Sequence, residues 1–178
     1  RAQLGIATRT RDYGQSALIT NVTPEMSHAN VAYERFTDTG PLALLPMSDN
    51  RCAVVWSAVP EQAEALQALG DEEFLAKLEE RFGGRLGRLR KVGRRAVYPL
   101  MRTDVAEIVR ERLVLIGNAA HTVHPVAGQG FNLGLRDAWD LAQALHAAED
   151  LGSERALARF AAQRRLDAAA TIGVTEVL

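Results

Sequence analysis

The sequence predicts an α+β fold in two parts: an antiparallel sheet with two helices over residues 1–103, then a strand and two long helices of α/β type over residues 104–178. Up to about residue 100, short segments rich in β-branched and aromatic residues are separated by turn residues, as in hairpins. A continuous apolar run at residues 112–118 is typical instead of a strand buried on both faces of a mainly parallel sheet. Segments with helical periodicity follow it.

Strands of the first part are predicted at residues 16–22, 31–37, 42–47 and 51–59. Asp49 and Asn50 lie between the last two of these segments. Both residue types tolerate the left-handed backbone conformation that a tight hairpin requires. Because strands joined by a tight hairpin pair antiparallel, this turn predicts an antiparallel sheet.

Two helices are predicted next, at residues 60–69 and 71–82, with Gly70 ending the first and Asp71 capping the second. The apolar side chains of the second helix share one face: Phe74, Leu75, Leu78 and Phe82. We expect this face to lie on the sheet.

The remaining elements are a strand, the apolar run and two helices. The strand is predicted at residues 94–100 and should end or kink at Pro99, because proline cannot donate to a sheet ladder. The helices are predicted at residues 131–148 and 154–170, with a break and a new cap at Gly152-Ser153.

Composition excludes several classes of protein. The 21 basic and 22 acidic side chains give a net charge of −1, so we expect no nucleic-acid partner, and the basic run at residues 81–95 is expected to be a solvated turn and strand edge. Cys52 is the single cysteine, which excludes an intrachain disulfide and suits a reducing compartment such as the cytoplasm. The apolar runs are far shorter than the roughly 20 residues that span a bilayer, so membrane association is expected to be peripheral.

The strongest chemical signal lies in residues 113–140, LVLIGNAAHTVHPVAGQGFNLGLRDAWD. Its GQGFNLG segment precedes a long helix, so unobstructed backbone amides should point outward at the positive end of that helix. Such a loop suits an anionic or negatively polarised ligand. It is not a dinucleotide fingerprint, because the spacing is GxGxxxG and roughly ten residues separate the loop from the preceding strand.

Two other signals are weaker. His121 and His124 form an HxxH, but no third ligand lies nearby in the sequence, so we expect ordinary loop hydrogen bonds and no metal. Cys52 lies in a predicted strand with no partner to activate its thiol, which argues against a nucleophile.

The string GNAAH followed by HPVAGQGFNLGLRDA resembles, without a gap, the second FAD-binding motif of the p-hydroxybenzoate-hydroxylase-like flavoprotein monooxygenases. The family pattern is GD-A-A-H followed by P-x-x-G-Q-G-x-N-x-G-x-x-D-A, so Asn118 stands where the family has Asp. An amide at this position can still accept and donate hydrogen bonds. This Asn and the segments NVTP, ERFT, GPLALLPMSD, RCAVVW, YPL and RRLDAAATIGVT are similar to the ubiquinone-biosynthesis hydroxylases of the 2-octaprenyl-6-methoxyphenol hydroxylase type.

The resemblance implies a FAD site. The residues that it assigns to FAD are Gly117, Asn118, Pro125, Gly128, Gln129, Gly130 and Asn132. Asn118 is expected at the ribityl or pyrophosphate region, Pro125 against the isoalloxazine, and the loop amides near its pyrimidine edge, where reduced flavin carries negative charge.

A substrate contact is also expected by analogy with the family layout. Tyr98, Pro99 and Leu100 would face the reactive side of the flavin, or would simply end a core strand. The sequence does not identify a catalytic residue.

Members of the family bind FAD, reduce it with NAD(P)H and use O2 to hydroxylate an electron-rich aromatic ring. The resemblance implies that residues 1–103 are a substrate-binding sheet domain and residues 104–178 the C-terminal part of a FAD-binding domain. The subgroup implies a polyprenylated methoxyphenol substrate, with peripheral contact at the inner membrane or a complex with other ubiquinone-pathway enzymes.

The family's GxGxxG and D-G motifs are absent from the sequence. The chain is therefore expected to be a fragment that lacks the N-terminal half of the FAD-binding domain, that binds FAD weakly or not at all, and that is inactive alone.

Three alternatives are weighed against this interpretation. A related flavin hydroxylase could act on a different ring position or substrate, and a non-catalytic partner domain could have lost its flavin. The retained GQG and Asn132 argue against the second, since a chain without flavin has no use for an open glycine loop at a helix start. The failed GxGxxG spacing disfavours a nicotinamide-only dehydrogenase.

Overall fold

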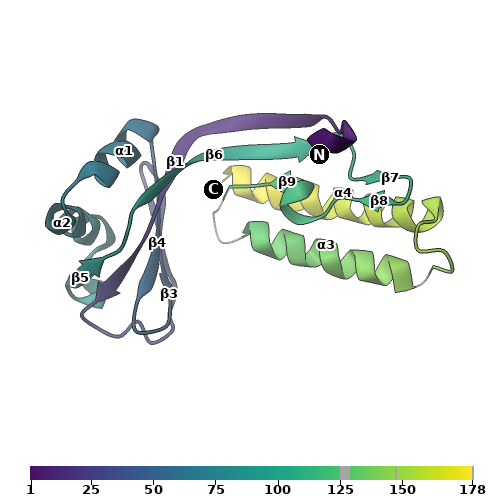
Figure 1. The fold of residues 1–178 in the computed structure, drawn as a ribbon. Coiled ribbons are helices and arrows are strands. Elements are labelled where there is room, and N and C mark those ends of the chain that lie inside the picture. Colours follow the sequence, from purple (N-terminus) through teal and green to yellow (C-terminus); the bar gives the residue numbers. More distant parts are fainter. Residues whose placement is uncertain (125–128, 147, 178) are drawn as a thin grey trace. The chain divides into compact units, whose positions relative to one another are not determined.

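The computed structural model describes residues 1–124, 129–146 and 148–177, with side chains up to residue 167. Two of the residues assigned to FAD, Pro125 and Gly128, lie outside the described residues. The chain divides into two compact units, Gly14–Leu100 and Arg1–Tyr13 with Met101–Leu178 (Figure 1).

The first unit is an antiparallel sheet covered on one face by two helices (Figure 1). The neighbouring strands follow the order β2-β3-β4-β1-β6, and β5 pairs with β1. The strands are β1 (Thr8–Pro24), β2 (Tyr33–Thr37), β3 (Gly40–Pro46), β4 (Cys52–Ala58), β5 (Leu89–Val92) and β6 (Ala96–Val105). The helices are α1 (Pro60–Ala68) and α2 (Asp71–Phe82), with a 3-10 turn, η2 (Gly84–Leu86), after α2. The predicted antiparallel sheet is confirmed.

The turn between β3 and β4 has the predicted left-handed backbone. Asp49 has φ 59° and Asn50 has φ 53°, and the Met47 amide donates to the Arg51 carbonyl at 2.8 Å. The Asn50 side chain also accepts from the amide of His28 at 3.3 Å. The turn therefore closes the hairpin and ties it to the loop after β1.

The core of this unit lies between the sheet and the helices. Register places Leu18 opposite Trp56, and Trp56 opposite Leu42, so these side chains share the face that α1 and α2 cover. The helices contribute Ala63, Leu66, Phe74, Leu78 and Phe82 to the same cluster. The apolar face predicted for residues 71–82 is confirmed. The opposite face carries both small and larger apolar side chains, among them Ala17, Ile19, Ala43, Leu45, Ala53 and Val55.

One local prediction in this unit is wrong, and one of the two outcomes expected at Pro99 is not observed. The N-cap of α2 is Gly70, and Asp71 is the first helical residue, so it pairs with Arg95 instead of capping. Pro99 does not end its strand, since β6 continues to Val105. A proline within a strand only removes one donor from the ladder, and the pairing on either side holds the strand together.

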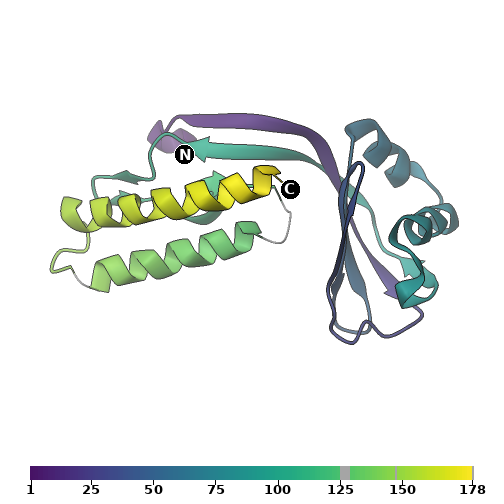
Figure 2. The same ribbon diagram turned by 180° about the vertical axis from the view of Figure 1, so that it is seen from behind.

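The second unit contains two long helices, α3 (Gln129–His146) and α4 (Glu154–Val177), which lie side by side (Figure 2). The smaller elements are η1 (Ala2–Leu4), β7 (Val109–Arg110), β8 (Leu113–Val114), η3 (Gly117–Ala119) and β9 (His121–Thr122). The predicted strand at residues 112–118 is reduced to β8, which pairs antiparallel with β7. Among the described residues, β8 pairs only with the two-residue strand β7, so it lacks the parallel neighbours that the prediction assumed.

Candidate cofactor site

A glycine turn follows β8 and lies against α3. Gly117 has φ 55°, in the left-handed region that favours glycine, and its amide donates to Asp137 Oδ2 at 2.7 Å. A Cβ placed on Gly134 would lie 3.4 Å from the Gly117 Cα, so the two backbones approach closely. The structure thus brings Gly117, and with it the exposed Asn118, onto α3.

The start of α3 supplies the other predicted contacts. Gln129 and Gly130 open the helix and Asn132 follows within its first turn, with an exposed side chain. The first four amides of any α-helix have no acceptor inside the helix and lie at the positive end of its dipole. The nearest atom to a Cβ on Gly130 would be Val123 Cγ2 at 3.6 Å, an ordinary contact. These residues and the Gly117 turn belong to adjoining elements, as a shared binding surface requires.

Asp137 ties the two elements together from beneath. Its side chain is 1% exposed. Oδ1 accepts from Arg164 Nε at 2.7 Å, while Oδ2 lies 3.0 Å from His121 Nε2 in addition to the Gly117 amide. One carboxylate therefore joins α3, α4, the turn η3 and β9.

The partner of Asp137 is itself surrounded by carboxylates. Arg164 is 2% exposed, and its NH1 and NH2 nitrogens lie 2.8 Å from Asp140 and 2.6 Å from Asp167. Burial lowers the pKa of Arg164, but the three carboxylates outweigh it and raise that pKa. The guanidinium is therefore charged and held on three sides. It borders, with His121, a cavity of about 420 Å³ within this unit.

The protonation state of Asp137 follows from the same contacts. Burial raises the pKa of this carboxyl, but the contacts with His121, the Gly117 amide and Arg164 outweigh burial and hold the pKa below its ordinary value. Asp137 is therefore ionised at neutral pH.

The two histidines of the HxxH have different partners. His121 lies on Asp137, whereas the ring of His124 meets the ring of Tyr13 edge-on at 5.2 Å between centroids. Burial lowers the pKa of His124. Across the described part of the chain, no group of three or more His, Cys, Asp or Glu side chains could hold a metal ion. Cys52 is fully buried and burial raises its pKa, which makes its thiol unreactive.

The residues proposed for the substrate do not share one face. Tyr98 is 57% exposed and Leu100 is 9% exposed, and side chains two apart in a strand point to the same side. Pro99, between them, points to the other side and is exposed.

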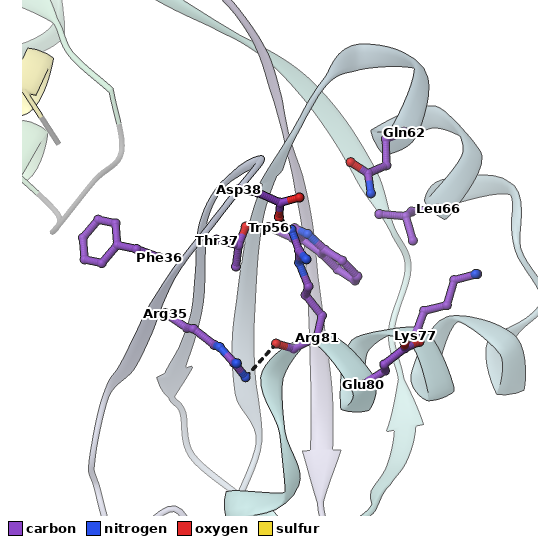
Figure 3. A pocket seen from close by; sticks show the side chains of 10 residues that line it. All are labelled: Arg35, Phe36, Thr37, Asp38, Trp56, Gln62, Leu66, Lys77, Glu80 and Arg81. Atoms are coloured by element: carbon purple, nitrogen blue, oxygen red, sulfur yellow. Dashed lines mark hydrogen bonds and ion pairs between the residues drawn. The ribbon is translucent and has the colours of Figure 1, made fainter.

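A recess of about 390 Å³ in the sheet unit offers a different environment (Figure 3). It lies beside Trp56, and charged side chains from β2 and α2 line it, including Arg35, Lys77 and Arg81. Arg81 pairs with Asp38, and Arg35 donates to the last carbonyls of α2. Because so many of its lining side chains are charged, the recess is poorly suited to an apolar aromatic ring.

Asp137 belongs to the motif but has no role assigned from the sequence, and Arg164 is not among the predicted site residues. A signal for Asp137 was present: it falls on the same face of α3 as the buried Leu133 and Ala144, where an acidic residue is costly unless paired. Arg164 carries the same kind of signal, since it lies four residues after Phe160 and seven after Leu157, both buried on one face of α4.

An antiparallel sheet unit joined to a unit with an open helix start beside a glycine turn defines a cofactor-binding protein of mixed α and β structure. The chain belongs to the family described as FAD binding domain, whose model matches residues 1–175. This confirms the family predicted from the GNAAH and GQGFNLG segments.

Relatives and solved structures agree with this assignment. The chain is 44% identical to ubiquinone hydroxylase UbiL of Rhodospirillum rubrum, covering 100% of this chain and 42% of that protein. It is 34% identical to 3-demethoxyubiquinol 3-hydroxylase of Escherichia coli, covering 94% of this chain and 44% of that protein. The solved structure of PqsL of Pseudomonas aeruginosa with 2-aminobenzoylacetate superposes with a TM-score of 0.78 at 27% identity, covering 99% of this chain and 50% of that chain. The chain thus spans about half the length of the proteins it matches.

Proposed function

We propose that the chain forms the substrate-binding sheet and the C-terminal part of the FAD site of an NAD(P)H- and O2-using monooxygenase. Its substrate would be a polyprenylated methoxyphenol of ubiquinone biosynthesis, which the enzyme hydroxylates on the ring. The observation that carries the proposal is the Gly117 turn, with the exposed Asn118, packed against the helix α3 at Gly134 and Asp137. The names of the two relatives support the choice of pathway.

The described residues fit FAD. Gly117 and Asn118 would lie at the ribityl or pyrophosphate region, and Gln129, Gly130 and Asn132 at the pyrimidine edge, joined by Pro125 and Gly128 from outside the described residues. When bound, FAD supplies the redox chemistry between NAD(P)H and O2. The positive end of α3 and its free amides stabilise negative charge at the pyrimidine edge. The Asn118 amide can both accept from and donate to ribityl hydroxyls.

Substrate binding is proposed for residues 1–103, and FAD binding for residues 104–178. The sheet face away from α1 and α2 carries the small side chains of Ala17, Ala43 and Ala53 together with the apolar side chains of Ile19, Leu45 and Val55, which suits contact with an apolar ring. Tyr98 and Leu100 would border this ring, with Pro99 on the other side of the strand. No helix in the described ranges is both long and apolar enough to cross a membrane. A polyprenyl substrate would instead bring the protein to the inner membrane from the cytoplasm, as a peripheral protein or with other pathway enzymes.

A chimera tests the function directly. The chain replaces the matching segment of the Rhodospirillum rubrum hydroxylase, whose remaining sequence supplies the rest of the protein. We expect the purified chimera to hold about one FAD per chain and to hydroxylate a short-chain prenylated methoxyphenol with NAD(P)H and O2.

The matched variant Asn132→Ala should weaken FAD binding about tenfold by removing one hydrogen bond, without lowering the melting temperature, because this side chain is exposed. A folded chimera without flavin would contradict the proposal and favour a partner domain that has lost FAD. A flavin-loaded chimera that hydroxylates only unrelated phenols would favour the related hydroxylase.

A further inference from the structure

We propose that Arg164 is a positioning residue for the FAD site: its guanidinium fixes the carboxylate of Asp137, and Asp137 in turn holds the Gly117 turn against α3. The consequence for FAD binding rests on the proposed function. The contacts that carry the inference do not involve FAD.

Asp137 and Arg164 carry opposite charges inside the fold. Asp137 is 1% exposed and Arg164 is 2% exposed, so neither charge is solvated by water. A buried carboxylate without a counter-charge is strongly destabilising, and the 2.7 Å contact between Oδ1 and Arg164 Nε supplies that charge. Arg164 thus supplies the counter-charge of Asp137, which His121 Nε2 and the Gly117 amide also contact.

Neighbouring carboxylates fix the orientation of the Arg164 guanidinium. The guanidinium of Arg164 is planar and rigid, and Asp140 and Asp167 hold its other two nitrogens at 2.8 Å and 2.6 Å. Arg136 Nε, at 3.1 Å, further restrains Asp167. Held on these three sides, Arg164 fixes Oδ1 of Asp137 and so sets the direction of Oδ2.

Asp137 Oδ2 contacts the turn that carries Asn118. Oδ2 receives the Gly117 amide at 2.7 Å and lies 3.0 Å from His121 Nε2, so both ends of the turn that contains Asn118 are anchored on one oxygen. Gly117 has a left-handed backbone, and a shift of its amide would carry Asn118 with it. Arg164 thus acts on the proposed flavin contacts through Asp137.

The test uses Arg164→Met and Arg164→Lys, with Arg159→Met as a control on an exposed arginine of the same helix. The first readout is hydrogen exchange of the Gly117 amide in the chain, under conditions in which each variant is folded. We expect exchange to accelerate at least tenfold in Arg164→Met, to be partly rescued in Arg164→Lys, and to be unchanged in the control. The second readout is the FAD dissociation constant of the chimera, expected to rise about tenfold in Arg164→Met.

The double variant Asp137→Leu with Arg164→Met separates positioning from stability. Removing the uncompensated charge of Asp137 should recover the part of the lost stability that this buried carboxylate causes, while Asp140 and Asp167 lack the guanidinium in both variants. Because the Gly117 amide still lacks its acceptor, the double variant should keep the fast exchange and the weak FAD binding.

Recovery of FAD affinity together with stability would overturn the positioning role, as would an Arg164→Met variant with wild-type Gly117 exchange. If the unmodified chimera binds no FAD, the proposed function fails, and the exchange readout still decides the role of Arg164.

Discussion

Replacing Gly117 by alanine tests whether the turn depends on its backbone conformation. The residue has φ 55°, and a Cβ added there would meet nothing within 4 Å. Any loss therefore comes from the left-handed conformation, which costs a residue with a Cβ about 1–2 kcal/mol. With a denaturant slope of about 2 kcal/mol per molar urea, the unfolding midpoint should fall by roughly 0.5–1 M.

Two matched variants interpret that loss. Gly117→Asn should recover part of it, because asparagine tolerates the left-handed region. Gly130→Ala should change the midpoint little, since its Cβ would make only an ordinary contact with Val123. The measurement is urea unfolding followed by far-ultraviolet circular dichroism. A Gly117→Ala chain with the wild-type midpoint, or a Gly117→Asn chain no more stable than Gly117→Ala, would refute the reasoning.

Three further predictions concern other sites. Burial lowers the pKa of His124 below 6.5, so the contribution of this side chain to stability is present above pH 6.5 and is lost as pH falls. The variant His124→Phe should therefore flatten the decline in the free energy of unfolding between pH 7 and pH 5, measured by urea unfolding. An unchanged slope would contradict this prediction. Arg35→Ala should cost about 0.5–1 kcal/mol by removing the bonds to the last carbonyls of α2, whereas the exposed Arg85→Ala should cost nothing measurable in the same assay. Asn50→Val should lower the melting temperature more than Asn50→Gly, because glycine loses only the side-chain bond while valine also strains the turn; equal losses would argue against backbone strain.

The antiparallel sheet unit could be predicted from the sequence because its signals are local. The Asp49-Asn50 turn and the single apolar face of α2 each depend on a few neighbouring residues, and both have the predicted geometry. The strand does not end at Pro99, since β6 continues to Val105 and a proline removes only one donor from the ladder.

The structure of the second unit depends on contacts between distant residues, which local sequence signals do not predict. The apolar run at residues 112–118 predicts burial on both faces, but a strand forms only where partners are present, and only β8 does so. The same limit applies to the candidate site. The resemblance assigned Gly117 and Asn118 to FAD, but each helix alone indicates only a buried charge, and the pairing of Asp137 with Arg164 joins residues from two different helices.

Hydrogen exchange of the chimera, measured with and without FAD, tests most directly that the Gly117 turn and the start of α3 form one FAD-binding surface. We predict that bound FAD slows the exchange of the amides of Gly117, Asn118, Gly130 and Asn132 together. Binding of FAD that leaves all four amides unchanged, while protecting other parts of the chain, would contradict the proposed site.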